Sequence, residues 1–293
     1  MEKGWVVLAA VISGFSVFLN KFGVAGIDPV LFATMKNVLV AIAVLTLTFA
    51  LKDAASLKRL QRSEWVRLVL VGLVGGAIPF ALFFTGLSMT AASSAALVQK
   101  TLFLWVGIGA VLFLREKIDW WLGAAAAFLF AGNLFLLRLH GWSFGAGELL
   151  ILIATLLWAG ETLLSKRLLE TLPSRIVVLG RMGFGSVFLI AWLLVAGKVS
   201  LVTTLNASAL GWVLLTSALL VAYVLTFYEG LKRTSASFAT TVLLVAAAIT
   251  GALEMLWTGV WSAPLVVGSL LVLGGLVLAM TRVVRSLRAS QAM

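Results

Sequence analysis

The stretch TAASSAALVQKTLFLWVGIGAVLFLREKID, residues 90–119, decides the fold class, because it is apolar over the length of a membrane-spanning helix and carries a lysine near its middle. A charge at bilayer depth costs between about 2.5 and 17 kcal/mol, depending on how the cost is measured. Such a side chain faces protein or a water-filled cavity rather than lipid. We therefore expect the rest of the chain to provide that environment for Lys100.

The composition indicates a polytopic helical membrane protein. Of the 293 residues, 62% are hydrophobic and 11% are charged, whereas a soluble domain carries roughly 25% charged residues. The apolar residues form continuous runs rather than alternating patterns, so strands are not expected. Ten segments are long enough to cross the membrane as helices. They lie at 4–22, 30–51, 65–88, 92–114, 119–137, 148–168, 174–197, 209–229, 236–258 and 264–282.

Several function classes are excluded by residues that the chain lacks. The absence of cysteine excludes disulfides, iron–sulfur clusters and thiol catalysis. A single histidine, His140, cannot build a His-rich metal site and is expected in a connecting loop. No phosphate-cradling glycine loop is present either. We therefore expect no cofactor, no metal, no catalytic residue and no enzymatic activity.

The net charge of +11 follows the loops rather than forming a nucleic-acid patch. With the N-terminus placed inside, the inner loops and tails hold 16 Lys and Arg residues and the outer loops hold 3. Because positive loops remain cytoplasmic, we expect both termini in the cytoplasm of a multi-pass plasma (inner) membrane protein. The expected partners are the lipid bilayer and a small-molecule substrate, not nucleic acid.

The two halves of the chain resemble each other. A shift of 145 places Lys21 on Lys166 and Lys36 on Arg181, and a shift of 144 places the TxAS at 90–93 on that at 234–237. Five spans is an odd number, so the two repeats must insert with opposite orientation. The domains expected are a first five-helix repeat (1–139), a linker (140–147), a second five-helix repeat (148–285) and a cytoplasmic tail (286–293). Inverted repeats with a site between them are a recurrent design of secondary transporters.

With these features, the chain resembles EamA-type members of the drug/metabolite transporter superfamily. The resemblance rests on GELLILIATLLWAGETLLSK (147–166), which opens the second half, and on SSAALVQKTLFLWVGIGAVLFLREKI (93–118). Glu116 matches the acidic residue that the family usually has after the fourth span. The resemblance implies two inverted five-helix repeats and a secondary transporter. It also suggests a homodimer formed through the fifth and tenth spans.

The chain departs from the family pattern at two places. Val260 or Trp261 stands where a matching acid is common in the second half, and Lys100–Thr101 replaces a proline often seen in the fourth span. A Lys-Thr pair in this span also resembles the sugar-phosphate and nucleotide-sugar branch of the superfamily, which recognises anions.

The candidate substrate-binding residues are the polar and aromatic groups at bilayer depth. Lys100 lies roughly 13 Å into its span, with Gln99 and Thr101 beside it, and Glu161 lies at similar depth in the sixth span with Trp158 one turn earlier. Trp105 is a further deep aromatic residue. Two interpretations of Lys100 stay open: it contacts an anionic or carbonyl-bearing substrate, or it is ion-paired to Glu161 and holds helices together. Glu161 could equally pair with Arg181 or exchange a proton.

The candidate gating or coupling residues are Lys36, Arg181, Glu161 and Glu229. Lys36 and Arg181 lie about a turn and a half inside their spans, so we expect both to extend to the interface. Asn20 and Asn133 are expected to serve helix packing.

The functional hypothesis is a secondary transporter, favoured as an exporter and possibly proton-coupled, for a small polar or amphipathic metabolite. The alternatives are an anion-selective sugar-phosphate or nucleotide-sugar-like exchanger, and a non-transport membrane scaffold or subunit.

Overall fold

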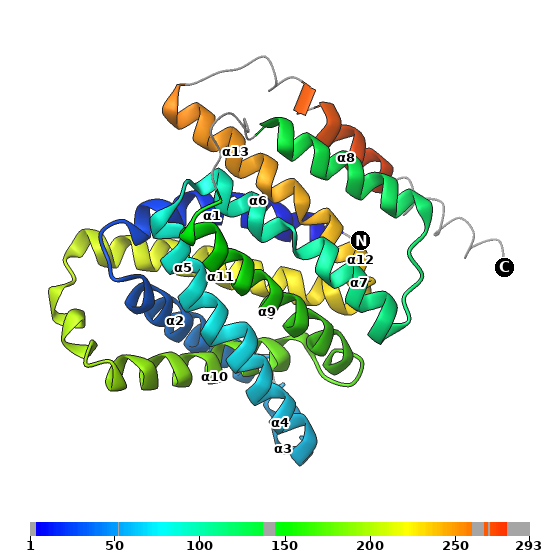
Figure 1. Ribbon diagram of the computed structural model, residues 1–293. Helices are drawn as coiled ribbons and strands as arrows, with labels where there is room; N and C mark the ends of the chain where they lie inside the picture. The colour runs from blue at the N-terminus through cyan, green and yellow to red at the C-terminus, as the bar shows by residue number, and fades with distance from the viewer. Residues whose placement is uncertain (1–3, 52, 137–143, 260–266, 269, 280–293) are drawn as a thin grey trace.

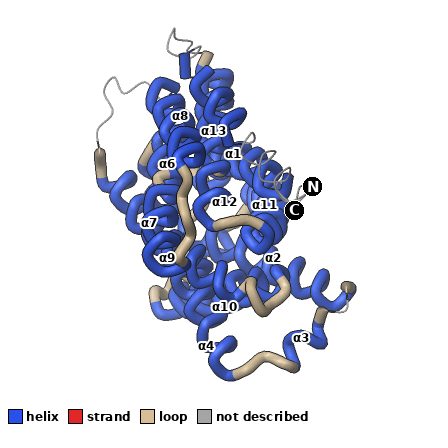
Figure 2. The backbone as a smooth tube through the Cα atoms, turned by 90° about the vertical axis from the view of Figure 1, so that its right-hand side faces the viewer, coloured by secondary structure: helices blue, strands red, loops and turns tan. Residues whose placement is uncertain are grey.

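The computed structural model describes residues 4–51, 53–136, 144–259, 267–268 and 270–279. Within these ranges the chain forms helices joined by short loops, and no strand occurs there (Figures 1 and 2). His140, the first part of the expected linker and the expected tail lie outside the described residues. The all-helical architecture expected from the continuous apolar runs is confirmed for the described part of the chain.

The described helices follow one another with few intervening residues. In chain order they are α1 (Gly4–Val24), α2 (Pro29–Ala50), α3 (Ala54–Lys58), α4 (Arg62–Val71), the π-helical segment η1 (Gly72–Ala77), α5 (Ile78–Met89), α6 (Ala92–Lys100), α7 (Leu102–Leu114), α8 (Trp120–Leu136), α9 (Ala146–Leu168), α10 (Ser174–Val195), the 3₁₀ helix η2 (Val199–Thr204), α11 (Ala207–Arg233), α12 (Ala236–Val242) and α13 (Leu244–Thr258). A shorter apolar helix follows at Leu270–Ala279.

Eight helices or continuous helical runs of the described chain are long and apolar enough to cross a membrane. Three of these runs combine neighbouring elements: α4, η1 and α5 form one, α6 and α7 another, and α12 and α13 a third. The fifth and tenth expected spans correspond to α8 and Leu270–Ala279, which are apolar but shorter. The described part of the chain therefore contains eight membrane-length helices or helical runs, and the count of ten stays a prediction.

The boundary between α1 and α2 shows how local sequence sets a helix end. Asp28 accepts hydrogen bonds from the backbone N–H groups of Val30 and Leu31, and Pro29 occupies the first turn, where a missing N–H costs nothing. Burial raises the pKa of the Asp28 carboxyl, but the ammonium of Lys198 and these N–H donors outweigh burial and hold the pKa below its usual value. The carboxylate thus both starts α2 and ties it to the loop after α10.

The central helices of the bundle come from both halves of the chain. α1 packs on α11, and α5 packs on α9, side by side in Figure 1. α2 packs on α10, and α6 packs on α13. When each helix is exchanged for its counterpart five spans away, the contact between α1 and α11 becomes that between α9 and α5. The contact between α2 and α10 is exchanged with itself, and the contact between α6 and α13 becomes that between α12 and α7, which also pack on each other.

Two of the membrane-length runs are interrupted near their middle. α6 ends at Lys100 and α7 begins at Leu102, while α12 ends at Val242 and α13 begins at Leu244. The intervening Thr101 and Leu243 therefore occupy similar positions in the two halves. Irregular backbone at membrane depth is tolerated where it is buried in protein or lines a cavity.

A third irregularity lies in the run from α4 to α5. The segment GLVGGA (Gly72–Ala77) is π-helical, and the Ile78 N–H bonds to the Leu73 carbonyl five residues back. Pro79 has no N–H, so it cannot bond to the carbonyl four residues earlier, which is that of Gly75. The Gly75 carbonyl therefore lacks the partner that a regular α-helix would give it, and it accepts hydrogen bonds from side chains of other helices.

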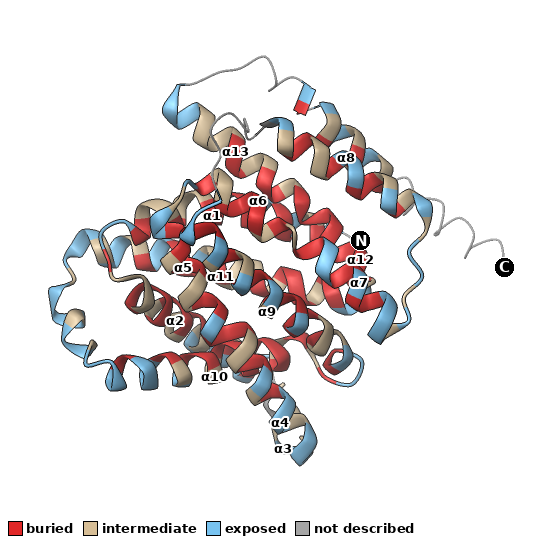
Figure 3. Ribbon diagram, in the orientation of Figure 1, coloured by how far each residue is buried: buried red, intermediate tan, exposed pale blue. Residues whose placement is uncertain are grey.

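Buried residues gather where the central helices meet, and exposed residues lie on the outer faces (Figure 3). Large apolar side chains are exposed on many of these outer faces, as expected where lipid replaces water. They include Ile42, Ile108, Leu112, Trp192, Leu214 and Trp257. The buried positions are mostly apolar, but they include the charged residues Lys36, Lys100, Glu161 and Arg181.

The fifth and tenth expected spans pack on each other within one chain. A Cβ on Gly132 of α8 would lie 2.8 Å from the Gly268 carbonyl oxygen, and one on Gly275 would lie 2.9 Å from the Leu129 nitrogen. Gly123 has open space around it, and Ala127 is exposed. The expected homodimer through these spans stays a prediction.

We predict that Gly76→Ala destabilises the bundle, because the new Cβ would lie 2.0 Å from the Arg181 carbonyl oxygen. Overpacking of this kind typically costs about 1–3 kcal/mol. The melting temperature in detergent should fall. The matched control is Gly160→Ala, an exposed helical glycine with open space around it. It should leave the melting temperature unchanged or slightly raised, since alanine favours helix. An unchanged melting temperature for Gly76→Ala would contradict the close packing of η1 on α10.

Candidate functional site

A cavity of about 70 Å³ lies between helices of the two halves. It is lined from α1, α2, α5, α6 and α7 of the first half and from α9, α10 and α11 of the second. The polar and charged lining residues are Ser13, Ser16, Asn20, Lys36, Gln99, Lys100, Glu161, Thr162, Arg181 and Tyr223; the apolar and other aromatic ones are Val17, Phe80, Phe83, Phe84, Leu102, Trp158, Leu220 and Phe227. A space of this size holds several water molecules.

Lys100 is the last residue of α6 and points into this cavity, with 3% of its surface exposed. Its ammonium donates to the Ser13 hydroxyl at 2.9 Å and to the Gln99 side-chain oxygen at 2.9 Å. A cation at the end of a helix is also favoured by the helix dipole. The helix break at Thr101 therefore places Lys100 where backbone and neighbouring side chains stabilise its charge.

Lys36 lies in the same cavity and is 1% exposed. Its ammonium donates to the Asn20 side-chain oxygen and lies 5.0 Å and 4.9 Å from the ring centroids of Phe32 and Phe84. The expectation that Lys36 extends to the interface is wrong. Its face of α2 points inward, where an amide oxygen and two aromatic rings are available.

Arg181 of α10 is likewise directed inward and is 5% exposed, so the same expectation is wrong for it. Its Nε donates to the Gly75 carbonyl at 3.2 Å, and its guanidinium lies 5.5 Å and 5.6 Å from the rings of Phe80 and Tyr228. The carbonyl freed by Pro79 is therefore one reason why this arginine can remain in the membrane interior.

Glu161 of α9 is 1% exposed and faces the cavity from the second half. It accepts hydrogen bonds from the Ser165 hydroxyl at 2.5 Å and from the Tyr228 hydroxyl. One turn earlier, the Trp158 indole donates to the Gly75 carbonyl at 2.9 Å. A Cβ on Gly75 would lie 2.3 Å from Glu161 Cγ, so η1 and α9 approach closely only because this residue is glycine.

The sequence left open whether Glu161 pairs with Lys100 or with Arg181. The described residues form three ion pairs, Asp53–Arg175, Asp28–Lys198 and Glu229–Arg233, and none of them lies in the cavity. The described cavity lining therefore holds three cationic side chains and one acid, with no direct ion pair among them.

Thr101 and Trp105 do not line the cavity. The Thr101 hydroxyl donates to the Val98 carbonyl at 2.7 Å, so the side chain stabilises the helix break. Trp105 is 39% exposed on the outer face of α7. Of the six residues expected to bind substrate, the structure brings together Lys100, Gln99, Trp158 and Glu161.

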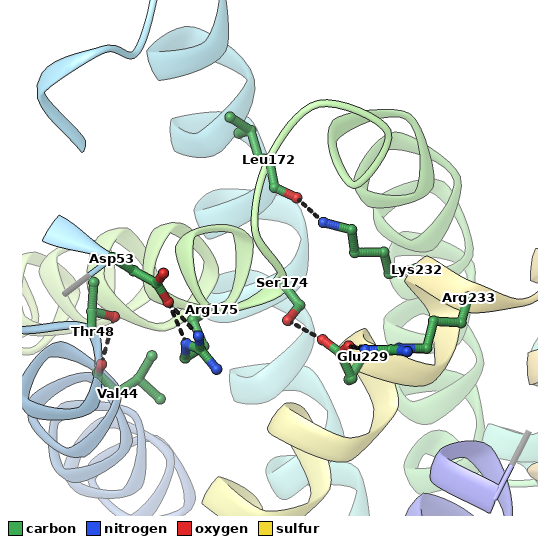
Figure 4. Close-up of polar contacts among 9 residues, drawn as sticks. All are labelled: Val44, Thr48, Asp53, Leu172, Ser174, Arg175, Glu229, Lys232 and Arg233. Atoms are coloured by element: carbon green, nitrogen blue, oxygen red, sulfur yellow. Dashed lines mark hydrogen bonds and ion pairs between the residues drawn. The ribbon is translucent and has the colours of Figure 1, made fainter. Parts of the chain in front are cut away.

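Glu229 lies in a separate polar cluster at the ends of α10 and α11 (Figure 4). Its carboxylate accepts from the Ser174 hydroxyl at 2.6 Å and pairs with Arg233 at 2.5 Å. Nearby, Arg175 pairs with Asp53 at 2.5 Å. The cluster lines a hollow of about 1000 Å³ that is distinct from the central cavity.

Sequence reasoning assigned Asn20 to helix packing, whereas Asn20 lines the cavity and accepts from Lys36, and it missed Ser13 and Ser16. Ser13, Ser16 and Asn20 all line the cavity, and the Asn20 amide donates to the Ser16 hydroxyl at 3.2 Å. Their spacing of three and four residues puts them on one helix face, which is the signal that could have revealed them. Asn133 agrees with its expected packing role, because its amide donates to the carbonyls of Leu129 and Leu244.

At one end of the cavity helices, Lys21 and Glu254 satisfy two helix termini. The Lys21 ammonium donates to the carbonyls of Leu87 at 2.8 Å and Thr90 at 2.5 Å, at the end of α5. Glu254 accepts from the Ser93 N–H at 2.7 Å, at the start of α6. We call Lys21, Thr90, Ser93 and Glu254 the first clasp.

The other end repeats this arrangement with the halves exchanged. The Lys166 ammonium donates to the carbonyls of Leu231 at 2.8 Å and Thr234 at 2.6 Å. Glu116 accepts from the backbone N–H and the hydroxyl of Ser237 at 3.1 and 2.7 Å. We call Lys166, Thr234, Ser237 and Glu116 the second clasp. Glu254 thus plays the part of Glu116 for the second half, although it does not stand at Val260 or Trp261.

Comparisons with known proteins agree with this architecture. The model of the EamA-like transporter family matches two stretches of the chain, residues 3–138 and 145–281. A protein of known crystal structure superposes with a TM-score of 0.72 at 20% identity, covering 94% of this chain and 98% of that one. At that identity the likeness concerns the fold alone.

Two curated relatives are named as transporters. "Uncharacterized transporter sll1164" of Synechocystis sp. is 27% identical over 148 residues, which is 47% of this chain and 42% of that protein. "Uncharacterized transporter in cobO 3'region" of Sinorhizobium sp. is 30% identical over 134 residues, which is 45% of this chain and 93% of that protein. The aligned part thus spans less than half the length of the Synechocystis relative.

We predict that Lys100→Met and Glu161→Gln affect stability independently, because no ion pair joins the two side chains. The coupling free energy in a double-mutant cycle of thermal unfolding should stay below about 0.5 kcal/mol. Lys100→Met alone should largely preserve the melting temperature, since it leaves no acid unpaired. A destabilised single variant that Glu161→Gln rescues by several kcal/mol would instead indicate an ion pair.

Proposed function

Because the chain belongs to the EamA-like transporter family, we propose that it is a secondary transporter that moves a small polar or amphipathic metabolite by alternating access. The observation that carries the proposal is the charged cavity enclosed between helices of both halves. A buried, polar, partly aqueous site at the junction of two repeats is what a transporter of this design requires. A scaffold has no need to keep several unpaired charges in its core.

The proposed architecture is ten spans arranged as two inverted five-helix repeats. Three observations support it: the two separate family matches, the helix contacts that interchange between the halves, and the paired clasps. The chain would divide near the loop between α8 and α9. The loop charges favour a cytoplasmic location for both termini. In that orientation the first clasp faces outward and the second faces the cytoplasm.

In the proposed mechanism, the two clasps are the gates of the cavity. Each clasp joins a helix end of one half to a helix end of the other through a carboxylate. Releasing one carboxylate frees the backbone N–H groups that start α6 or α12 and lets the two broken helices separate at that end. Retaining the other keeps the opposite end closed, so the cavity would open to one side at a time.

The proposed direction is export in exchange for protons, as the family resemblance suggests. Glu161 is the one carboxyl group among the described lining residues, which makes it the candidate proton carrier. Its hydrogen bonds to Ser165 and Tyr228 would then change with each proton exchanged. Lys36 and Arg181, expected at gates, contribute instead to the charge of the cavity.

Alternating access can be measured without knowing the substrate, because the chain has no native cysteine. Ser16→Cys would place a single thiol in the cavity lining. We expect a membrane-impermeant maleimide to reach it from each face in different states. Glu254→Gln should raise the labelling rate from outside, and Glu116→Gln should raise it from the cytoplasmic side.

The matched control for these variants is Glu64→Gln, which removes an acid that belongs to neither clasp. It should leave both labelling rates unchanged. A thiol at residue 16 that no reagent reaches from either face in any variant would favour the scaffold. If Glu254→Gln raised labelling only from the cytoplasm, the proposed orientation would be wrong.

We further predict that Lys100→Met abolishes solute counterflow in proteoliposomes while the protein stays folded. The solute would be one selected from a metabolite library by its ability to raise the melting temperature. The physical reason is that Lys100 supplies a cavity charge that methionine lacks. The control Lys58→Met makes the same change at an exposed position of α3 and should transport normally. Full transport by the Lys100→Met variant would show that Lys100 is not part of the substrate-binding site.

A further inference from the structure

We propose that the cavity binds an amphipathic organic anion, with a carboxylate held by Lys100 and an apolar body, preferably aromatic, against the ring wall of α5, α9 and α11. This inference rests on the proposed transport function and specifies its substrate class. It follows from the charge of the lining, from the way the cations are distributed, and from the aromatic side chains that line the same cavity.

The charge of the described lining is unbalanced. Lys36, Lys100 and Arg181 are each at least 95% buried, and each donates only to neutral oxygens, those of Asn20, of Ser13 and Gln99, and of the Gly75 carbonyl. Neutral acceptors orient a buried cation but do not neutralise it. A bound anion would supply the missing charge, and the protein itself offers only Glu161.

Glu161 is already engaged elsewhere. Its carboxylate accepts from Ser165 and Tyr228, and it lies within electrostatic reach of Arg181. It therefore offsets part of the charge of Arg181 but leaves Lys36 and Lys100 without a counter-charge. An amine or other cation entering the cavity would meet more positive than negative charge, which disfavours cationic substrates.

The two lysines are held apart rather than clustered. Lys36 donates to Asn20 and Lys100 donates to Ser13. The two acceptors, Ser13 and Asn20, are separated by two turns of α1. At 1.5 Å per residue this separation is roughly 10 Å along the helix axis. A phosphate group is typically held by cations that converge on it. Separated cations suit a carboxylate at one pole of a longer molecule.

Part of the cavity lining is aromatic. Trp158 packs against Phe80 and Phe83 with ring centroids 5.6 and 5.4 Å apart, and Tyr223 stacks on Phe227 at 5.6 Å. All five side chains line the cavity. The rings offer few hydrogen bonds to the hydroxyl groups of a sugar, because the uncharged polar lining residues lie mainly on α1 and α6 rather than on this wall. Rings instead bury an apolar or aromatic body, so the wall disfavours a sugar phosphate.

The test is the binding of a matched series of probes to the purified full-length protein, followed by thermal unfolding. The series is 3-phenylpropionate, its neutral amide, 3-phenylpropylamine, L-phenylalanine, acetate and glucose 6-phosphate. We expect 3-phenylpropionate to raise the melting temperature at a concentration at least about tenfold below that needed for the amide or for acetate, since both the charge and the ring contribute.

Variants assign the effect to the cavity. Lys100→Met should weaken 3-phenylpropionate binding by about tenfold or more, and Lys100→Arg should retain most of the binding because it keeps the charge. Lys58→Met should bind as the parent does. An equal affinity of Lys100→Met and the parent for 3-phenylpropionate would overturn the proposal.

The other outcomes also decide. Preference for 3-phenylpropylamine would overturn the anion proposal, and a clear preference for L-phenylalanine would replace it with a zwitterion that uses Glu161. Preference for glucose 6-phosphate would favour the sugar-phosphate alternative. Failure of every carboxylate to bind would also overturn it.

The substrate class and the transport function fail in different ways. Lys100-dependent counterflow of a neutral or cationic solute would support the proposed transport function and refute the proposed anionic substrate class. Suppose instead that 3-phenylpropionate binds tightly and in a Lys100-dependent way, but a maleimide reaches the thiol at residue 16 from neither face. That result would support the anion site and refute the proposed transport function.

Discussion

The structure depends on keeping charge inside a membrane bundle. Lys36, Lys100 and Arg181 are all buried, and none of them forms an ion pair within the described cavity. Hydrocarbon cannot solvate such groups, so protein oxygens, aromatic rings and enclosed water must do so. Much of the interior follows from this requirement: a polar face on α1, rings beside the cations, and a small cavity where the two halves meet.

Backbone irregularity supplies part of that environment. Pro79 cannot donate to the Gly75 carbonyl as a residue in a regular α-helix would, and two side chains from the other half donate to it. The break at Thr101 ends α6 at Lys100, so a helix C-terminus lies next to a cation. In an ordinary membrane helix these carbonyls would be used internally. The polar site thus uses backbone groups as well as side chains.

The ends of the bundle use the same chemistry for a different purpose. Each clasp satisfies a helix C-terminus with a lysine and a helix N-terminus with a glutamate. The carboxylate comes from the opposite half of the chain, so the contact joins two elements that can move apart. Hydrogen bonds to helix termini are charge-assisted but few in number. In the proposed mechanism, that combination holds an end closed and still permits it to open.

The sequence by itself determined the membrane class, the helical architecture and the position of Lys100 inside a membrane-length helical run, because hydropathy and 1.5 Å per residue depend only on composition and order. It also placed Gln99, Trp158 and Glu161 among the candidates that the structure brings to one cavity. Only the tertiary structure decided that Lys36 and Arg181 turn inward, that Trp105 turns outward, and that Glu254 caps α6. Helical position alone leaves the direction of a side chain open. The face of a helix that meets another helix, and the acceptors found there, depend on contacts between residues far apart in the chain.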